Sequence, residues 1–437
     1  MHSFRYRDGH LHCEDVDLVR VAEQLGTPTY VYSSGTILDH YARLDAALAS
    51  LDHLICYAVK ANSNRAILKL LANAGAGFDI VSGGELYRVL AAGGDSAKCT
   101  FAGVGKSGEE IEYALEQSVY SFNVESEAEL EHINRIASAK TMRAPIALRV
   151  NPDVNPHTHE YISTGSHENK FGIVLDHIGA VYQQAAKMPN IEIIGIQMHI
   201  GSQITRAKPF ASSIKTVTPI VRELKSRDAI KFLSIGGGMG IVYRRALESG
   251  SGKWWRDHDG ESAAFSVRDY AEAVVPPLRE LGLRILVEPG RFLVGNAGIL
   301  LTRVRYIKKT GTKKFVIVDA GMNDLIRPAL YQSFHEIVPI EDPSMNKSKS
   351  KVEKIDIVGP VCESGDFFAL DRELPEPHEG ELLAIMSAGA YGLVMASNYN
   401  SRPLPAEALV RGDKFALIRK RQTSADLVRD EMDPKWL

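Results

Sequence analysis

Short apolar runs alternate with longer amphipathic segments along most of the first two thirds of the chain. Eight such runs occur, at residues 53–59, 77–81, 98–103, 119–124, 145–150, 191–200, 230–235 and 283–288. Several are apolar almost throughout, which is typical of parallel strands that are covered on both faces. Eight strand–helix alternations predict an α/β fold of the (β/α)₈ barrel type, and a doubly wound open sheet is the structural alternative.

The segments between these runs carry local signals for helices. Ser107 with Glu110, and Ser126 with Glu129, fit the capping-box pattern of a helix start. The segment that contains Pro276–Pro277 reads as a helix that is kinked or broken at the two prolines.

The character of the sequence changes near residue 293. Beyond this point strand-like runs such as GILLTRVRYIKK and KKFVIVDAG follow one another with little helix between them, which predicts a mostly β domain. We therefore expect an N-terminal segment, residues 1–32, that joins the β domain, a barrel over residues 33–292, and the β domain itself over residues 293–437.

Composition excludes several classes of protein. The 437 residues carry a formal net charge of −3 and no long Lys/Arg block, so a nucleic-acid partner is not expected. The four cysteines form no C-x-x-C pair, so neither a disulfide framework nor a zinc site is expected. The polar start lacks a signal-peptide pattern, and no apolar run reaches the ~18 residues of a membrane span. These features predict a soluble, cytoplasmic protein.

Two glycine-containing motifs and a lysine fall at run ends, where the active site of such a barrel forms. GGGMG, Gly236 to Gly240, ends the seventh run, and EPGR, Glu288 to Arg291, ends the eighth. Successive backbone N–H groups of such loops can hold a phosphate, although tight turns also use glycine runs. Lys60 ends the first run and is either a solvated strand-end lysine or an amine that faces this loop. An amine opposite a phosphate-binding loop suggests pyridoxal 5′-phosphate.

Further candidates each have a structural and a functional interpretation. His199 ends the sixth run. It is either a core histidine or an imidazole that packs on a cofactor ring, and in the second case Ser202 would bond to the phosphate. Glu288 is a paired or surface carboxylate, or the partner of a pyridine nitrogen.

The β domain holds its own candidates. Cys362, in VCESGD, is by default a buried structural thiol beside two acids. Arg327 and Tyr331, in RPALY, could bind a carboxylate or form a surface contact. Tyr391, in SAGAYG, could be a packed aromatic side chain.

An ordered set of fragments, taken together, resembles the fold-type III pyridoxal-phosphate decarboxylases, the group of ornithine, diaminopimelate and arginine decarboxylases. The set runs nearly from end to end: TPTYVYS, YAVKANSN, FDIVSGGEL, HTHEYISTG, NKFGI, HIGSQI, GGGMGI, EPGRFLV, DAGMNDLIRPALY, CESGD, SAGAYG and SNYNSRP. The resemblance implies a (β/α)₈ barrel with a β domain, and a head-to-tail homodimer whose active sites lie at the subunit interface.

The resemblance also implies a role for each matching residue. Lys60 would form the Schiff base with the cofactor, and Cys362 of the partner subunit would be the catalytic acid. The remaining cofactor contacts would be His199, Ser202, Gly236, Gly237, Gly238, Glu288, Gly290, Arg291 and Tyr391. The substrate contacts would be Arg291, Arg327, Tyr331, Tyr391 and, from the partner subunit, Glu363.

Among the substrates that this resemblance implies, charge favours one. Arg291 and Arg327 suit a distal carboxylate and Glu363 suits a distal ammonium group, so the expected reaction is decarboxylation of meso-2,6-diaminopimelate to L-lysine. Ornithine, arginine and carboxynorspermidine are alternative substrates, and a non-catalytic pyridoxal-phosphate-binding barrel is a remote alternative. The chain departs from the usual family pattern at Ala102–Lys106, at Ser166–His167 and at Pro276–Pro277, none of which carries an expected site residue.

Overall fold

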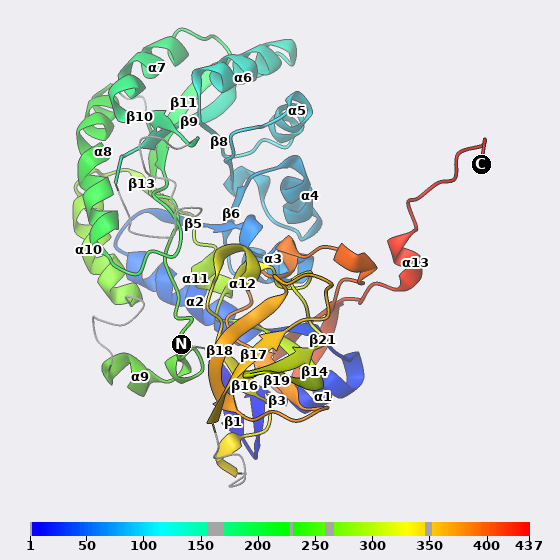
Figure 1. Cartoon of the computed structure of the whole chain (residues 1–437). Helices are drawn as coiled ribbons and strands as arrows, with labels where there is room; N and C mark the ends of the chain where they lie inside the picture. Colours follow the sequence, from blue (N-terminus) through cyan, green and yellow to red (C-terminus); the bar gives the residue numbers. More distant parts are fainter. Residues whose placement is uncertain (1, 155–169, 228–229, 258–265, 346–351) are drawn as a thin grey trace. The chain divides into compact units, whose positions relative to one another are not determined.

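The computed structural model describes residues 2–154, 170–227, 230–257, 266–345 and 352–437. It contains two compact units (Figure 1). The barrel unit comprises Leu38–Ile241 and Asp259–Leu293, and the β unit comprises Met1–Ile37, Val242–His258 and Val294–Leu437. Residues 242–258, which lie in the range expected for the barrel, group with the β unit.

The barrel unit is built on a closed parallel sheet (Figure 1). Its strands, in order around the barrel, are β5 (His53–Ala58), β6 (Gly77–Ile80), β7 (Cys99–Phe101), β8 (Ser121–Val124), β9 (Ala144–Asn151), β11 (Ile191–Met198), β12 (Phe232–Ser234) and β13 (Arg284–Val287). The pairing of β13 with β5 closes the barrel, with Leu286 opposite Leu54. The (β/α)₈ prediction is therefore confirmed and the open-sheet alternative is excluded.

Helices connect the strands and surround the barrel. They are α2 (Ser34–Leu48), α3 (Arg65–Asn73), α4 (Gly83–Ala91), α5 (Gly108–Glu116), α6 (Glu127–Ala139), α7 (Ile178–Ala185), α8 (Lys208–Ser226) and α10 (Val267–Arg279). The expected capping box of Ser107 and Glu110 starts α5. Ser126 caps α6, but the Glu129 carboxylate accepts a hydrogen bond from the backbone N–H of Glu125.

Helix α10 continues through both of its prolines. The break considered from the sequence at Pro276–Pro277 is therefore absent. Pro276 is exposed and Pro277 is half-buried, while Val274, Val275 and Leu278 are buried. Because the prolines lie toward solvent in the last turns, the carbonyl groups that lose their N–H partners can be hydrated, and the buried face keeps its packing.

The barrel interior changes from apolar to polar along its axis. Residues that pack together in the apolar part include Leu54, Ala147, Phe232 and Leu286. A Cβ atom on Gly195 would lie 2.4 Å from the Phe232 ring, so the absence of a side chain there makes room for the phenyl group. Toward the carboxyl ends the inward positions are polar, namely Asp79, Asn123, Arg149, Gln197, Ser234 and Glu288. Polar side chains are thus gathered at the end of the barrel where an active site is expected.

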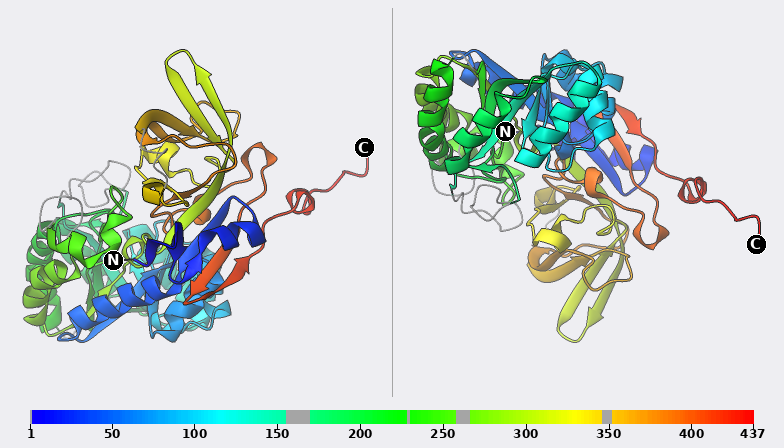
Figure 2. Two further views of the ribbon diagram at one scale, coloured as in Figure 1. Left: turned by 90° about the horizontal axis from the view of Figure 1, so that it is seen from below. Right: turned by 90° about the horizontal axis from the view of Figure 1, so that it is seen from above.

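The β unit is a large mixed sheet with a small three-stranded sheet, β1 (Phe4–Arg7), β2 (His10–Cys13) and β3 (Val16–Asp17). The large sheet has the order β18 (Phe367–Pro375), β17 (Val352–Val358), β15 (Lys313–Val318), β14 (Gly298–Thr310), β4 (Thr29–Ser33), β20 (Ala406–Arg411) and β21 (Lys414–Arg419). Strands β19 (Leu382–Ile385) and β16 (Ile337–Pro339) branch from β14. Strands β14 and β15 pair in antiparallel fashion and form a long hairpin, which is yellow-green in Figure 2.

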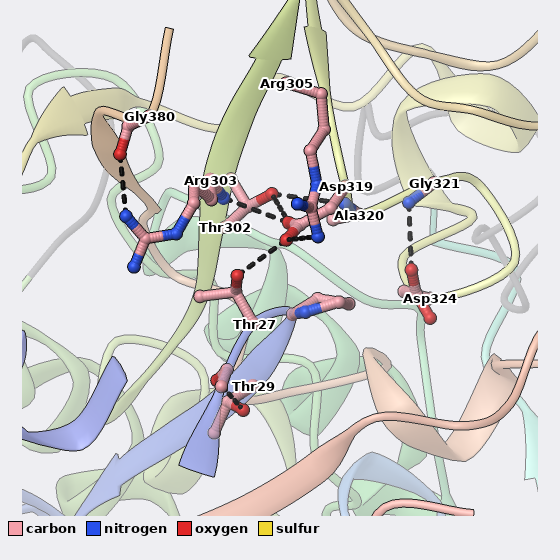
Figure 3. Close-up of polar contacts among 12 residues, drawn as sticks. Thr27, Thr29, Thr302, Arg303, Arg305, Asp319, Ala320, Gly321, Asp324 and Gly380 are labelled. Carbon is pink, nitrogen blue, oxygen red and sulfur yellow. Dashed lines mark hydrogen bonds and ion pairs between the residues drawn. The ribbon is translucent and has the colours of Figure 1, made fainter. Parts of the chain in front are cut away.

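A buried carboxylate ties together the segments of the β unit (Figure 3). Asp319 follows β15 and accepts hydrogen bonds from the Thr302 hydroxyl at 2.7 Å and from the backbone N–H of Arg303 at 2.9 Å. Its other oxygen accepts a hydrogen bond from the Thr27 hydroxyl at 2.6 Å. One side chain thereby links the start of the loop at residues 319–326 to β14 and to the N-terminal segment. Among the described residues, no helix is long and apolar enough to cross a membrane.

Candidate active site

The amine of Lys60 lies against a buried carboxylate at the carboxyl end of the barrel. Lys60 belongs to the 3₁₀ turn η1 (Val59–Ala61), which directly follows β5, and its Nζ atom is 2.5 Å from Oδ2 of Asp79. The neighbouring strand β6 carries Asp79, opposite Ala58. The Lys60 side chain is 40% exposed and the Asp79 side chain 1% exposed. The amine is therefore held at the barrel mouth by a charged partner.

Sequence reasoning did not identify Asp79. The signal was an acid inside the otherwise apolar run GFDIV, since a carboxylate is seldom fully buried without a cationic partner.

Two further acids surround this amine. Glu85, in the first turn of α4, accepts a hydrogen bond from the backbone N–H of Val81 at 2.8 Å. Burial raises the pKa of Glu85 to about 7, against the opposing effects of this hydrogen bond and of Lys60. Burial likewise raises the pKa of Glu288 to about 7, with a further contribution from the charge of Asp79. The lysine thus faces acids that hold protons more tightly than ordinary carboxyl groups do.

Glu288 is oriented by two side chains from neighbouring strands. Its Oε1 atom accepts a hydrogen bond from the Ser234 hydroxyl at 2.6 Å, and its Oε2 atom accepts one from the Gln197 amide at 3.0 Å. The side chain is buried at the end of β13 rather than exposed on the surface. Ser234 and Gln197 were not identified from the sequence, because a polar residue in a strand gives no indication of its partner.

The triple-glycine loop packs so closely that no side chain fits. A Cβ atom on Gly236 would lie 2.4 Å from the carbonyl oxygen of Met198, and one on Gly237 would lie 2.1 Å from that of Glu288. Gly236 and Gly238 also have positive φ angles, +68° and +108°. The loop therefore packs its backbone directly against the ends of β11 and β13, and within the protein the N–H groups of Gly236 and Gly237 donate to Ser234 Oγ and to His199 Nδ1.

His199 follows β11 and is bonded to the same loop. Its Nδ1 atom accepts a hydrogen bond from the backbone N–H of Gly237 at 3.1 Å. Burial lowers the pKa of His199 well below its ordinary value, and the charges of Arg149 and Lys60 lower it further. The imidazole is therefore neutral, and because Nδ1 is an acceptor its proton is on Nε2. A neutral ring at this position can lie against a planar ligand.

Arg291 and Ser202 meet at the next loop. The guanidinium Nη2 atom of the buried Arg291 donates to the Ser202 hydroxyl at 3.0 Å. The preceding Gly290 approaches the end of β5, since a Cβ atom on it would lie 3.0 Å from that of Ala61. The EPGR loop and the Lys60 turn are therefore neighbours, as expected from their places at the carboxyl ends of paired strands.

The β unit brings Arg327 between two aromatic rings. Arg327 begins the short helix α12 (Arg327–Tyr331), and its guanidinium carbon lies 5.5 Å from the ring centre of Tyr243 and 5.7 Å from that of Tyr331. It also donates to the Ser333 hydroxyl at 3.2 Å. This stacking fixes a planar cation that can bind a carboxylate. Tyr243 was missed because it lies far from RPALY in the sequence.

The loop that carries Cys362 and Glu363 is held by Asp366. The Asp366 carboxylate accepts hydrogen bonds from the backbone N–H groups of Val361 and Met322, both at 2.6 Å. Cys362 is exposed, whereas the other cysteines, Cys13, Cys56 and Cys99, are buried. The default interpretation of Cys362 as a buried structural thiol is therefore wrong, because this residue is exposed.

Tyr391 has an unusual backbone conformation. Its φ angle is +56°, in the left-handed region that bulky side chains seldom adopt. Such strain occurs mainly where a side chain must be placed for function, so it is consistent with the ligand contact expected for Tyr391.

The departures from the family pattern lie partly within the described residues. Lys106 is buried in the loop after β7, and its amine donates to the carbonyl groups of Gly103 and Asn123 and to the Glu129 carboxylate, at 2.7, 3.0 and 2.6 Å. This loop is therefore organised around an internal ion pair. Ser166 and His167 lie outside the described residues.

Comparison with known proteins identifies the class to which this fold and site belong. Residues 34–295 match the family described as "Pyridoxal-dependent decarboxylase, pyridoxal binding domain". The protein is therefore a pyridoxal-dependent decarboxylase, as its barrel and its lysine-containing mouth suggest.

Curated relatives then define the family within this class. The chain is 48% identical to the diaminopimelate decarboxylase of Pseudomonas aeruginosa over 99% of both chains, and 46% identical to that of Vibrio cholerae over 98% of both. It is also similar to the crystal structure of diaminopimelate decarboxylase from Helicobacter pylori complexed with L-lysine. That similarity has a TM-score of 0.86 and 40% identity, over 94% of this chain and 98% of the other. The chain belongs to the diaminopimelate decarboxylase family.

Proposed function

We propose that this protein decarboxylates meso-2,6-diaminopimelate to L-lysine and carbon dioxide, with pyridoxal 5′-phosphate as its cofactor. The observation that supports this proposal most strongly is the barrel mouth, where the Lys60 amine lies 2.5 Å from Asp79 within the range that matches the pyridoxal-binding family. The near-full-length similarity to diaminopimelate decarboxylases supports the choice of substrate. The formal net charge of −3 gives no reason to propose a nucleic-acid partner.

The residues at the mouth fit this cofactor. Lys60 supplies the amine that the aldehyde requires, and the buried Oδ1 atom of Asp79 has no hydrogen-bond partner among the described residues. The loop of Gly236 to Gly238, which has no room for a side chain, would hold the phosphate together with Ser202 and the Gly290–Arg291 backbone, and Ser202 is bonded to Arg291. When bound, the cofactor supplies an electron sink for the charge left by loss of carbon dioxide.

Two residues of the barrel would tune the ring. Glu288, fixed by Ser234 and Gln197, presents a carboxyl group whose raised pKa allows it to share a proton with a ring nitrogen. His199, neutral and anchored to Gly237, would pack on the ring face without adding a positive charge. Both features favour flow of negative charge toward the ring nitrogen.

The substrate would be recognised by charge at its distal end. Arg291, Arg327 and Tyr331 would bind the distal carboxylate, and the partner subunit's Glu363 would bind the distal ammonium group. Tyr391 would contact both cofactor and substrate. An ornithine decarboxylase needs no arginine pair for a distal carboxylate, because ornithine has none, so these residues favour diaminopimelate over ornithine.

The proton that replaces carbon dioxide would come from the partner subunit's Cys362. Cys362 is exposed in this chain and lies in a loop whose backbone is bonded to Asp366, so it is available to another subunit. We therefore propose a homodimer in which each active site uses residues from both chains.

Release of carbon dioxide from different amino acids tests the proposed substrate. The purified holoenzyme should release carbon dioxide from meso-2,6-diaminopimelate at least about a hundredfold more efficiently, by kcat/KM, than from ornithine, arginine or carboxynorspermidine, since a buried polar group left unpaired is costly. Borohydride reduction followed by peptide mass mapping should place the cofactor on Lys60. A preference for ornithine would refute the substrate, and labelling of another lysine would refute the site.

A further inference from the structure

The segment at residues 397–402, SNYNSR, has no role in the proposed reaction, yet it is strained and connects two functional loops. It contains the turn η9 (Tyr399–Ser401), in which Asn400 and Ser401 have left-handed φ angles of +55° and +52°. Asparagine tolerates this conformation better than most residues, but two such residues in succession are uncommon. Strain of this kind is retained where the surrounding structure needs it.

One side of the segment holds the loop with the proposed acid and the proposed ammonium-binding residue. The backbone N–H of Cys362 donates to Oδ1 of Asn400 at 2.9 Å. The neighbouring Tyr399 lies near enough to Glu363 for that carboxylate to raise the pKa of the Tyr399 hydroxyl group, chiefly through hydrogen bonding. Two neighbouring residues therefore contact the two neighbouring functional residues one to one.

The other side of the segment is anchored to the loop that leads to Arg327. The backbone N–H of Ser397 donates to the carbonyl oxygen of Asn323 at 2.9 Å. The guanidinium group of Arg402 donates to the carbonyl oxygen of Asp319 at 3.0 Å, and Asp319 is the buried carboxylate that ties the segments of this unit together. The turn at residues 399–400 is thus braced on a rigid base.

We infer that Tyr399 and Asn400 are positioning residues, through which Tyr399 orients Glu363 toward the distal ammonium group of the substrate and Asn400 fixes the backbone of Cys362. This inference rests on the proposed function. Its physical reason is that an exposed glutamate has many rotamers, and ordering it on binding costs free energy. A hydrogen bond from a stiff aromatic side chain removes part of that cost before the ligand arrives.

Two competitive inhibitors separate positioning from a general structural effect. L-Lysine has an α-ammonium group beside its carboxylate, and these are the two groups of the distal end of the substrate. 6-Aminohexanoate keeps the carboxylate and the ammonium group at the opposite end but lacks the α-ammonium group. Tyr399→Phe in the holoenzyme should weaken inhibition by L-lysine about five- to tenfold, the range expected for loss of one ordinary hydrogen bond. Inhibition by 6-aminohexanoate should change by less than about twofold. Tyr306→Phe removes the hydroxyl of a tyrosine that is 64% exposed on β14, and is the matched control with neither effect.

Glu363→Gln shows whether a failure lies in the inference or in the proposed function. If this variant loses discrimination between the two inhibitors and Tyr399→Phe does not, the role of Tyr399 is refuted and the proposed function stands. Equal weakening of both inhibitors by Tyr399→Phe also refutes the positioning role. If Glu363→Gln itself retains discrimination, the proposed recognition of the distal ammonium group is wrong, and the inference fails with it.

Asn400 has its own pair of variants. Asn400→Gly keeps the left-handed backbone accessible but removes the acceptor for the Cys362 N–H, so it should lower kcat about tenfold with little change in KM. Asn400→Asp retains an acceptor oxygen and should restore most of kcat. Equal losses in both variants, or a change in KM alone, would overturn this role.

Discussion

The carboxylate of Asp79 determines where the Lys60 amine lies at the barrel mouth. Lys60 lies in a turn where its long side chain could extend into water, yet its Nζ atom contacts Asp79, which is almost fully buried. A buried carboxylate is costly without a cation, so each group restrains the other. The amine is thereby fixed at the barrel mouth, close to Glu288 and Glu85. Of these four residues, only Lys60 and Glu288 were expected at the barrel mouth from the sequence. The positions of Asp79 and Glu85 are known only from the structure.

A methyl group at position 237 tests the close approach of the glycine loop. Gly237→Ala would place a Cβ atom 2.1 Å from the carbonyl oxygen of Glu288, so the loop and the end of β13 must separate. We expect a loss of about 3 kcal/mol or more in the free energy of unfolding, and cofactor affinity should fall at least tenfold. Denaturant unfolding and titration with pyridoxal phosphate measure both. Gly105→Ala adds a Cβ atom in open space, and an equal effect there would contradict the explanation.

At the scale of elements, parallel strands and their loops gather the site at one end of the barrel. Register places Arg149 beside Gln197, and Gln197 beside Ser234, so polar side chains from distant segments form one layer. Periodicity predicted the strands and therefore the end at which Lys60, His199 and the glycine loop lie. It could not predict the continuous helix α10, because the outcome depends on which face of the helix its prolines occupy.

The loop between β15 and α12 contains a buried acid whose ionisation should affect stability. Burial raises the pKa of Asp324 from 3.8 to about 7, while its oxygens accept hydrogen bonds from the Gly321 N–H and the Asn323 amide, both at 2.9 Å (Figure 3 shows the first). The pKa of Asp324 is therefore higher in the folded protein than in the unfolded chain. The contribution of protonated Asp324 to the free energy of unfolding is complete below the unfolded pKa and is lost as the pH rises through about 7.

Asp324→Asn should therefore remove this pH dependence. The free energy of unfolding of the variant should fall below that of wild type by about 2 kcal/mol less at pH 8 than at pH 5. The reason is that wild type has already lost the contribution of protonated Asp324 at the higher pH. Denaturant unfolding of the full chain at both pH values is the measurement. Asp430→Asn, at an exposed position, is the control. If Asp324→Asn showed the same change in free energy of unfolding between pH 5 and pH 8 as wild type, the assignment would be contradicted.

At the scale of the whole molecule, the candidate residues are divided between two compact units. The barrel unit carries Lys60 and Glu288, and the β unit carries Arg327 and Cys362. The β unit is assembled from three separate stretches, and strand β4 from the N-terminal stretch lies between β14 and β20. The chain therefore cannot be cut into independent pieces at a single linker.

Mixing two inactive variants tests the proposed sharing of active sites between subunits. Lys60→Ala and Cys362→Ala should each reduce kcat to about 1% or less, since each would remove a group that the proposed reaction requires. After unfolding and refolding together in equal amounts, half of the dimers are mixed and each has one intact site, so activity should return to about a quarter of wild type. No recovery, although dimers form, would mean that Cys362 serves the site of its own chain.

The sequence by itself determined the barrel and the end of it at which the candidate residues Lys60, His199 and Glu288 lie. These follow from periodicity and from loop chemistry, both of which act over a few residues. Tertiary structure alone decided the partners: Asp79 for Lys60, Ser234 and Gln197 for Glu288, Tyr243 for Arg327, and Tyr399 and Asn400 for the loop of Cys362. Each pair joins segments that are distant in the sequence, and only strand register and chain packing bring them within hydrogen-bonding or stacking distance.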